Sequence, residues 1–274
     1  MSDAAKKVMD LAVRLAENHD LPDDALYTLI TERNEETALF LRNEARALCE
    51  RIYGRFVYIR GLIEFTNYCK NDCYYCGIRR SNREAERHRL TEEEILSCCE
   101  AGYGLGFRTF VLQGGEDPYF TDERLGSIVA SIRGLCPDCA ITLSAGERSH
   151  DSYRRLHDAG ADRYLLRHET ADPCHYGRLH PESMSFDKRM AALKDLKEIG
   201  YQTGCGFMVG SPYQTASMIV KDLRFMKEFG PHMIGIGPFL SHKDTPFCDM
   251  ENGTAELTLY LLSVIRLMMP KVLL

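Results

Sequence analysis

The sequence predicts an α/β protein, a TIM-type (β/α) barrel with an N-terminal helical cap. Short apolar strand-like runs alternate with helical patterns in six successive units after residue 55. Informative polar residues fall at the ends of these strands, where barrel enzymes build their sites. No G-x-G-x-x-G follows the first strand, which argues against a doubly wound dinucleotide-binding sheet.

The first 54 residues are predicted to be helical. Val8, Leu11 and Leu15 recur at helical spacing, Pro22 suits the first turn of a second helix, and a third helix is expected over residues 35–51. We therefore expect a helical cap at residues 1–54 and one catalytic barrel domain at residues 55–274.

Strands and helices then alternate along the barrel. Strands are expected at residues 56–65, 109–113, 140–143, 163–166, 203–209 and 232–238. Helices are expected at residues 91–103, 122–135, 149–159, 187–199, 214–229 and 256–268. Thr91 and Glu94 form a capping box at the start of the first of these helices.

The strand count falls short of a closed barrel. Eight strand–helix units need about 250 residues, and a seventh strand only begins at residues 271–274. The seventh and eighth strands are therefore expected to be missing or incomplete, and the chain is expected to be a truncated version of something longer.

Composition excludes several classes of function. Hydrophobic residues make up 45% and charged residues 27%, and the formal net charge is −6, so nothing attracts nucleic acid or an anionic membrane. Residues 257–274 are apolar but interrupted by Arg266, Pro270 and Lys271, so no membrane span is expected. No signal peptide opens the chain, which predicts a cytoplasmic protein.

One loop carries most of the chemistry. Cys69, Cys73 and Cys76 have the spacing C-x3-C-x2-C directly after the first strand. A [4Fe–4S] cluster normally takes four cysteines, so three in one loop would leave one iron open to a small molecule. Structural zinc usually takes four closed ligands in paired C-x2-4-C and H-x3-5-H elements, and no second pair follows at such a spacing. Zinc and an unmetallated loop remain the alternatives.

The remaining candidate ligands give weaker signals. Of eleven cysteines, Cys136 and Cys139 form a C-x2-C that is capable of redox chemistry or metal binding, but it falls at a helix-to-strand turn and is expected to be structural. The histidines have no ligand-like spacing and are expected to be solvated or locally bonded.

Four stretches carry a family resemblance: residues 65–80 around the cysteines, 112–117 (LQGGED), 167–170 (RHET) and 204–212 (GCGFMVGSP). On these motifs the chain, from about residue 55, resembles the radical S-adenosylmethionine (SAM) superfamily. Within it, the chain resembles the [FeFe]-hydrogenase maturase family HydE, with biotin synthase and methylornithine synthase as more distant relatives.

The resemblance implies two cofactors, a [4Fe–4S] cluster on the three cysteines and SAM on the open iron. Arg167 and Glu169 alternate on the fourth strand and both face the barrel mouth, while His168 faces away. Glu169 would then hydrogen-bond SAM, and Arg167 would meet a SAM or substrate carboxylate, since its guanidinium pairs with carboxylates in two parallel bonds. Arg189 would neutralise the SAM carboxylate.

Further positions follow from the same resemblance. Gly114, Gly115 and Glu116 match the superfamily's GGE motif, in which small residues allow close approach and oxygens accept from the SAM ammonium. Five other positions give weaker sequence signals: an aromatic residue expected beside the adenine, two strand residues expected near the adenine, and two hydroxyl residues expected to hold a substrate anion. They are Tyr75, Met233, Ile236, Thr142 and Ser144.

The implied activity is reductive cleavage of SAM to methionine and a 5′-deoxyadenosyl radical. Its electron would come from a ferredoxin- or flavodoxin-type donor. A HydE-like role implies an organometallic iron–cysteine substrate and the maturation proteins HydF and HydG as partners. The alternatives are a biotin synthase- or methylornithine synthase-type enzyme acting on an amino acid, and a non-catalytic cluster-binding scaffold.

Two departures from the HydE pattern bear on the substrate. Paired threonines after the last helix, which help to bind the substrate carboxylate in that family, are absent. Gly114 also replaces a serine seen in some relatives. For a protein of these 274 residues alone, we expect poor folding, or cluster loading without full turnover.

Overall fold

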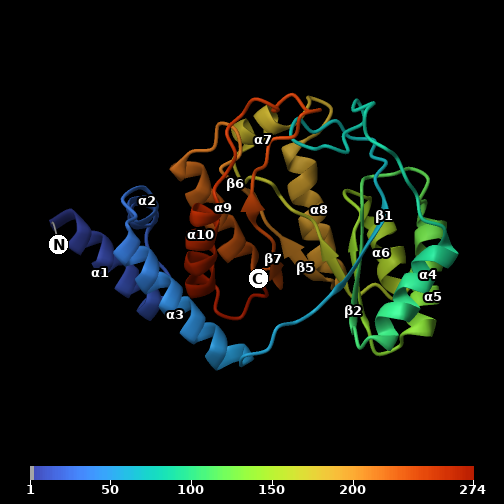
Figure 1. Ribbon diagram of the computed structural model, residues 1–274, viewed down its shortest axis with the longest axis horizontal. Coiled ribbons are helices and arrows are strands. Elements are labelled where there is room, and N and C mark those ends of the chain that lie inside the picture. Colours follow the sequence, from blue (N-terminus) through green and yellow to red (C-terminus); the bar gives the residue numbers. More distant parts are fainter. Residues whose placement is uncertain (1–2) are drawn as a thin grey trace.

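The computed structural model describes residues 3–274 and is built on a parallel sheet wrapped by helices (Figure 1). The sheet has the order β1-β2-β3-β4-β5-β7, and every neighbouring pair is parallel. Its strands are β1 (Gly61–Thr66), β2 (Thr109–Gly114), β3 (Ala140–Ser144), β4 (Arg163–Leu165), β5 (Gln202–Cys205) and β7 (Met233–Ile234). Sequential strands therefore lie side by side, as the predicted barrel topology requires.

The connecting helices begin within two residues of their predicted starts. They are α4 (Glu92–Gly104), α5 (Asp122–Leu135), α6 (His150–Asp158), α8 (Phe186–Ile199), α9 (Ala216–Phe229) and α10 (Ala255–Met268). A serine or threonine caps each one and accepts from a backbone N–H of the first turn. At Thr91 the full capping box with Glu94 is present.

The two faces of the sheet differ in chemistry. Phe110, Leu112 and Leu143 are buried in the main apolar cluster together with residues of the helices. The alternate positions point the other way, and the register places Thr142 beside Val111 and Ser144 beside Gln113. Polar side chains of β3 therefore lie on the inner face.

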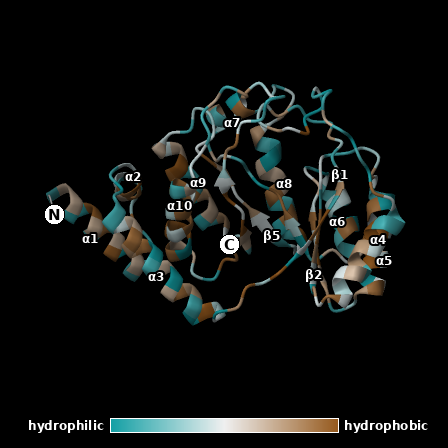
Figure 2. Cartoon of the chain, in the orientation of Figure 1, coloured by the Kyte–Doolittle hydropathy of each residue, from teal (hydrophilic) through white to brown (hydrophobic). Residues whose placement is uncertain are grey.

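Three N-terminal helices, α1 (Asp3–Asn18), α2 (Asp23–Thr31) and α3 (Glu35–Tyr53), lie beside α9 and α10 (Figure 1). Both α3 and α10 carry apolar residues, brown in Figure 2, and the two helices are in contact. Leu41 and Leu261 share one buried cluster, and the Tyr260 hydroxyl donates to Leu29 O at 2.7 Å. The division at residue 54 stays a prediction. No helix within residues 3–274 is both long and apolar enough to cross a membrane.

The first strand is shorter than predicted. Residues 56–59 form an extended connection, with Val57 87% exposed, and pairing begins only at Gly61, opposite Phe110. Because β2 starts at Thr109, residues 56–59 have no neighbouring strand on that side.

Each of the last two predicted strands is broken into two pieces. After β5 the chain continues as β6 (Met208–Val209), and after β7 as β8 (Gly237–Pro238); these two short strands pair with each other. The break follows from a close approach of two backbones, because a Cβ on Gly206 would lie 1.9 Å from Gly235 O. Gly206 also has a φ of 154°, which side-chain-bearing residues rarely adopt.

One helix was not predicted, α7 (Pro173–Leu179). Asp172 caps it by accepting from His175 N at 2.9 Å, and Pro173 occupies its first turn. After α10, Leu273 forms a parallel bridge with Met233, so the residues predicted to begin another strand return to the sheet.

Candidate functional site

The three cysteines lie in an irregular loop at the carboxyl end of β1, and all are half-buried. The loop is held by its own polar groups. The Arg87 guanidinium donates to the carbonyls of Ile78, Arg79 and Asn82 at 2.7–3.0 Å. Asp72 accepts from Arg79 Nε at 2.9 Å and from the Ser81 hydroxyl at 2.7 Å. These bonds fix the loop without help from a metal.

The thiols of Cys69, Cys73 and Cys76 suit a cluster better than a single ion. Among residues 3–274, only His150, Asp195 and Glu198 bring three metal-ligating atoms within 4.8 Å of one another. The three sulfurs are therefore too dispersed for one zinc ion with Zn–S bonds of about 2.3 Å. Burial raises the pKa of all three thiols, that of Cys73 to about 12, so their thiolates need a bound cation.

The glycines of the GGE motif, Gly114 and Gly115, pack against the cysteine loop and the end of β1. A Cβ on Gly115 would lie 2.3 Å from Tyr68 O and 2.8 Å from Cys69 Cβ. The close approach that requires glycine here is therefore that of the cysteine loop itself, rather than of a ligand. Gly114 is also confined, since its Cβ would lie 2.7 Å from Thr66 Cγ2.

Glu116 is engaged within the protein. Its carbonyl accepts from Lys70 N at 2.9 Å, Oε1 accepts from Glu147 N at 2.8 Å, and Oε2 lies 3.1 Å from Lys70 Nζ. Its predicted contact with the SAM ammonium stays a prediction, and its oxygens retain acceptor capacity for a further donor.

The end of β4 brings Arg167 and Glu169 together. Arg167 Nη2 lies 3.0 Å from Glu169 Oε2, although the contact lacks hydrogen-bond geometry. The strand itself ends at Leu165, so the predicted alternation of Arg167 and Glu169 on the fourth strand is wrong and these residues follow it. His168 is fully buried, with Nε2 3.3 Å from Asp222 Oδ1 on α9. Glu169 has a φ of 65°, a strained conformation for a residue with a side chain.

Arg189 sits near the start of α8 and reaches the same place. It is buried, pairs with Glu147 Oε1 through Nε, and donates to Arg167 O at 2.7 Å through Nη1. Glu147 therefore already pairs with the positive charge of Arg189, the residue that the resemblance assigns to the SAM carboxylate. Glu147 was missed in the sequence, because nothing in its local pattern marks a residue that contacts a helix 42 positions later.

Several buried polar atoms in this region have no hydrogen-bond partner in the protein. They are Thr142 Oγ1, Arg167 Nε and Glu169 Oε2. Buried polar groups are nearly always hydrogen-bonded, so unpartnered ones beside a ligand loop indicate atoms supplied by a ligand. These residues fit a bound polar cofactor.

The remaining predicted residues are placed as follows. The Tyr75 hydroxyl lies 3.2 Å from His180 Nε2, with its ring edge-on to the imidazole. Ser144 is half-buried at the end of β3. Met233 is buried on β7, and Ile236 packs against the main apolar cluster. Their roles toward adenine or substrate stay predictions.

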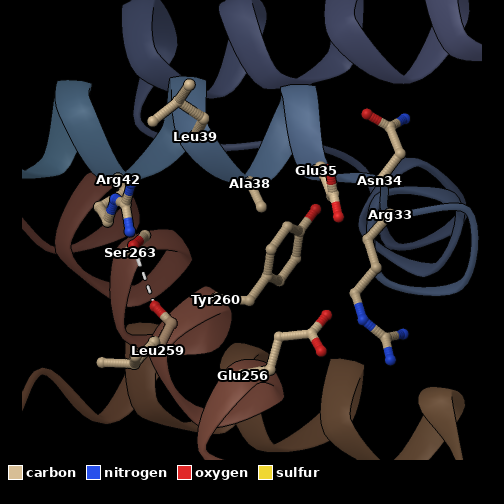
Figure 3. Close-up of a pocket in the computed structure, with 10 residues that line it drawn as sticks. All are labelled: Arg33, Asn34, Glu35, Ala38, Leu39, Arg42, Glu256, Leu259, Tyr260 and Ser263. Atoms are coloured by element: carbon tan, nitrogen blue, oxygen red, sulfur yellow. Dashed lines mark hydrogen bonds between the residues drawn. The ribbon is translucent and has the colours of Figure 1, made fainter.

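Two hollows of about 480 Å³ differ in their relation to the cysteines. One lies between α3 and α10 and contains none of the predicted site residues (Figure 3). The other adjoins the cysteine loop and is lined by Lys70, Glu116 and Glu147 among others. The second is the one continuous with the candidate site.

Comparison with known proteins is consistent with this geometry. The family model for the radical SAM superfamily matches residues 63–226. The [FeFe] hydrogenase maturase subunit HydE of Thermotoga maritima is 44% identical over 242 residues, covering 88% of this chain and 68% of that protein. The 3-methylornithine synthase of Methanosarcina barkeri is 32% identical over 266 residues, covering 95% and 74%.

A solved structure gives the same relationship. The crystal structure of methylornithine synthase (PylB) superposes with a TM-score of 0.88 at 30% identity, covering 96% of this chain and 77% of that one. The superfamily consists of enzymes that use a [4Fe–4S] cluster and SAM, and the matched range contains the cysteine loop, the β4 end and Arg189. The chain belongs to the radical SAM superfamily.

Proposed function

We propose that the chain is a HydE-like radical SAM enzyme that acts in maturation of the [FeFe]-hydrogenase active site. The observation that carries this is the 44% identity to HydE across a range that includes the cysteine loop. The preformed loop and the unpartnered atoms beside it support the same proposal.

In this proposal Cys69, Cys73 and Cys76 hold the [4Fe–4S] cluster. When bound, the cluster and SAM supply a 5′-deoxyadenosyl radical by reductive cleavage. The chain's own residues orient the ligands. Arg167 offers an unpartnered Nε to a carboxylate, and Glu169 offers an unpartnered Oε2 to a donor. Thr142 supplies a hydroxyl to the substrate from the inner face of β3.

The substrate and partners follow from the HydE likeness. We propose an organometallic iron–cysteine substrate, functional association with HydF and HydG, and an electron donor of ferredoxin or flavodoxin type. The acidic balance of the chain supports neither a nucleic-acid nor a membrane partner.

A second candidate is an amino-acid mutase of methylornithine synthase type. The high structural similarity to methylornithine synthase favours it, since the overlap extends over 96% of this chain. The two candidates differ in substrate. Reconstituted protein incubated with lysine, SAM and reductant forms a methylornithine-type product only under the second.

Anaerobic reconstitution tests the shared chemistry. The enzyme is expected to carry roughly four iron atoms per chain and to release 5′-deoxyadenosine with SAM and dithionite. Cys73→Ser should lose both. Cys98→Ser is the matched control, because Cys98 is an exposed thiol on α4, and it should retain both. Bound zinc without SAM cleavage would instead identify a scaffold.

A further inference from the structure

Tyr176 on the unpredicted helix α7 has a buried hydroxyl with no partner. Its side chain is 1% exposed, and its OH makes no hydrogen bond within the protein. A buried hydroxyl in this state costs about 1–3 kcal/mol relative to one that is bonded, so its persistence needs an explanation.

The ring of Tyr176 is fixed against the cysteine loop. It stacks on His180 with ring centroids 4.0 Å apart, and His180 Nε2 in turn lies 3.2 Å from the hydroxyl of Tyr75, which precedes Cys76. Tyr74 N donates to Leu179 O at 3.0 Å, which ties the end of α7 to the same loop.

The surroundings of the hydroxyl are those of the candidate site. The groups whose electrostatic influence reaches Tyr176 include Arg189, Glu147 and Glu169, together with the thiol of Cys73. Arg189 donates to the carbonyl of Arg167, whose Nε is a second buried donor without an acceptor. The Tyr176 hydroxyl and Arg167 Nε are thus two buried donors without an acceptor, and both are associated with Arg189. A ligand that brings acceptor oxygens and negative charge, such as a carboxylate, would satisfy them.

We propose that Tyr176 is a ligand-binding residue whose hydroxyl donates a hydrogen bond to the carboxylate of bound SAM. The inference rests on the proposed function and adds a contact from α7 to it. Phe186 packs against the Tyr176 ring and His180 stacks on it, so the hydroxyl is held in place before the ligand arrives.

Tyr176→Phe tests the proposal because it removes only the hydroxyl. Tyr201→Phe is the matched control, since Tyr201 is equally buried but its hydroxyl donates to Tyr153 O at 2.8 Å. Both variants are prepared with the cluster reconstituted. Without SAM, Y176F should melt at or above the parent temperature, whereas Y201F should melt below it, because only Y201F loses a hydrogen bond.

Binding should show the opposite order. By equilibrium dialysis, the dissociation constant for SAM should rise about five- to tenfold in Y176F and stay unchanged in Y201F. With decarboxylated SAM as the probe, parent and Y176F should bind equally.

Each contrary outcome has a definite meaning. An unchanged dissociation constant for SAM in Y176F, or a deficit that persists with decarboxylated SAM, overturns the inference while leaving the proposed function intact. A lower melting temperature of Y176F without SAM would show a partner within the protein and also overturn it. A parent that binds no SAM overturns the proposed function as well.

Discussion

Gly115→Ala should displace the loop that carries Cys69, Cys73 and Cys76. The new Cβ would lie 2.3 Å from Tyr68 O and 2.8 Å from Cys69 Cβ, whereas ordinary contacts begin at 3.4 Å. The loop must therefore move by about 1 Å. The nearest atom is backbone, so no side-chain rotation relieves the overlap.

The cost can be worked from the contacts at risk. Overpacking in a well-packed region costs about 1–3 kcal/mol. Displacing the loop also strains the bonds from Gly115 N to Thr66 O and from Lys70 N to Glu116 O, each worth about 0.5–1.5 kcal/mol. These costs add to about 2–6 kcal/mol, which at about 2 °C per kcal/mol corresponds to a fall in melting temperature of about 4–12 °C for a chain of this size.

The assay measures melting temperature and iron content after anaerobic reconstitution. Gly134→Ala is the matched control, because Gly134 lies within α5 and a Cβ there meets nothing within 4 Å. That control should raise stability by about 0.5–1 kcal/mol and leave the iron content unchanged. G115A should lose both stability and iron.

One result would refute the reasoning. If G115A binds iron like the parent and melts within 1–2 °C of it on the scale set above, then the GGE glycine does not hold the cysteine loop. Its role would then have to be toward the ligand, as the family pattern first suggested.

Three further predictions concern the surrounding framework. Gly206→Ala places a Cβ 1.9 Å from Gly235 O at a φ of 154°, so circular dichroism should show little folded protein, and a native spectrum would contradict the close approach. His180 is buried and its pKa is lowered to about 4, below its ordinary value of 6.5, so the unfolded chain takes up the proton first. The free energy of unfolding should therefore fall as the pH drops from 6.5 to 4, by up to about 1.4 kcal/mol per pH unit. The slope of this free energy against pH should be smaller in His180→Asn and unchanged in the control His150→Asn. Equal slopes in the parent and His180→Asn would contradict the prediction. Asp222→Ala leaves His168 Nε2 and Ala171 N without their acceptor, and urea unfolding should show a loss of stability of about 3 kcal/mol. Asp222→Asn keeps an acceptor oxygen and should lose less stability. Equal losses in the two variants would mean that the charge of Asp222 matters rather than its acceptor oxygen.

Much of the fold was predictable because its signals are local. Thr91, Thr121 and Ser149 each act on backbone groups three residues away, so the helix starts could be read from short stretches. The strand breaks at Gly206 and Gly235 were not predictable in the same way. Their cause is the meeting of two backbones almost thirty residues apart, which no short window contains.

The candidate site likewise contains features that a short stretch of sequence reveals and features that it does not. The cysteine spacing is local, and it could be read from one short stretch. Arg167 and Glu169 lie in contact after the end of β4, although not through the strand alternation that was predicted for them. Glu147 and Tyr176 are not local. Each reaches the site only because a loop or helix that reads as ordinary surface folds over the barrel mouth.

The carboxylates of the candidate site are paired with cations, two of them through contacts between residues that are distant in the sequence. Glu116, Glu147 and Glu169 are each met by a cation from elsewhere in the chain: Lys70, Arg189 and Arg167 respectively. Without ligand each of these carboxylates therefore lies beside a cation, while Arg167 Nε, Glu169 Oε2, Thr142 Oγ1 and Tyr176 OH lack a hydrogen-bond partner. The ammonium and the carboxylate of SAM can each pair with an opposite charge at this mouth, and its sulfonium leaves the ligand with one net positive charge. SAM binding should accordingly depend on both groups of its methionine end, and an analogue that lacks either one should bind more weakly than SAM itself.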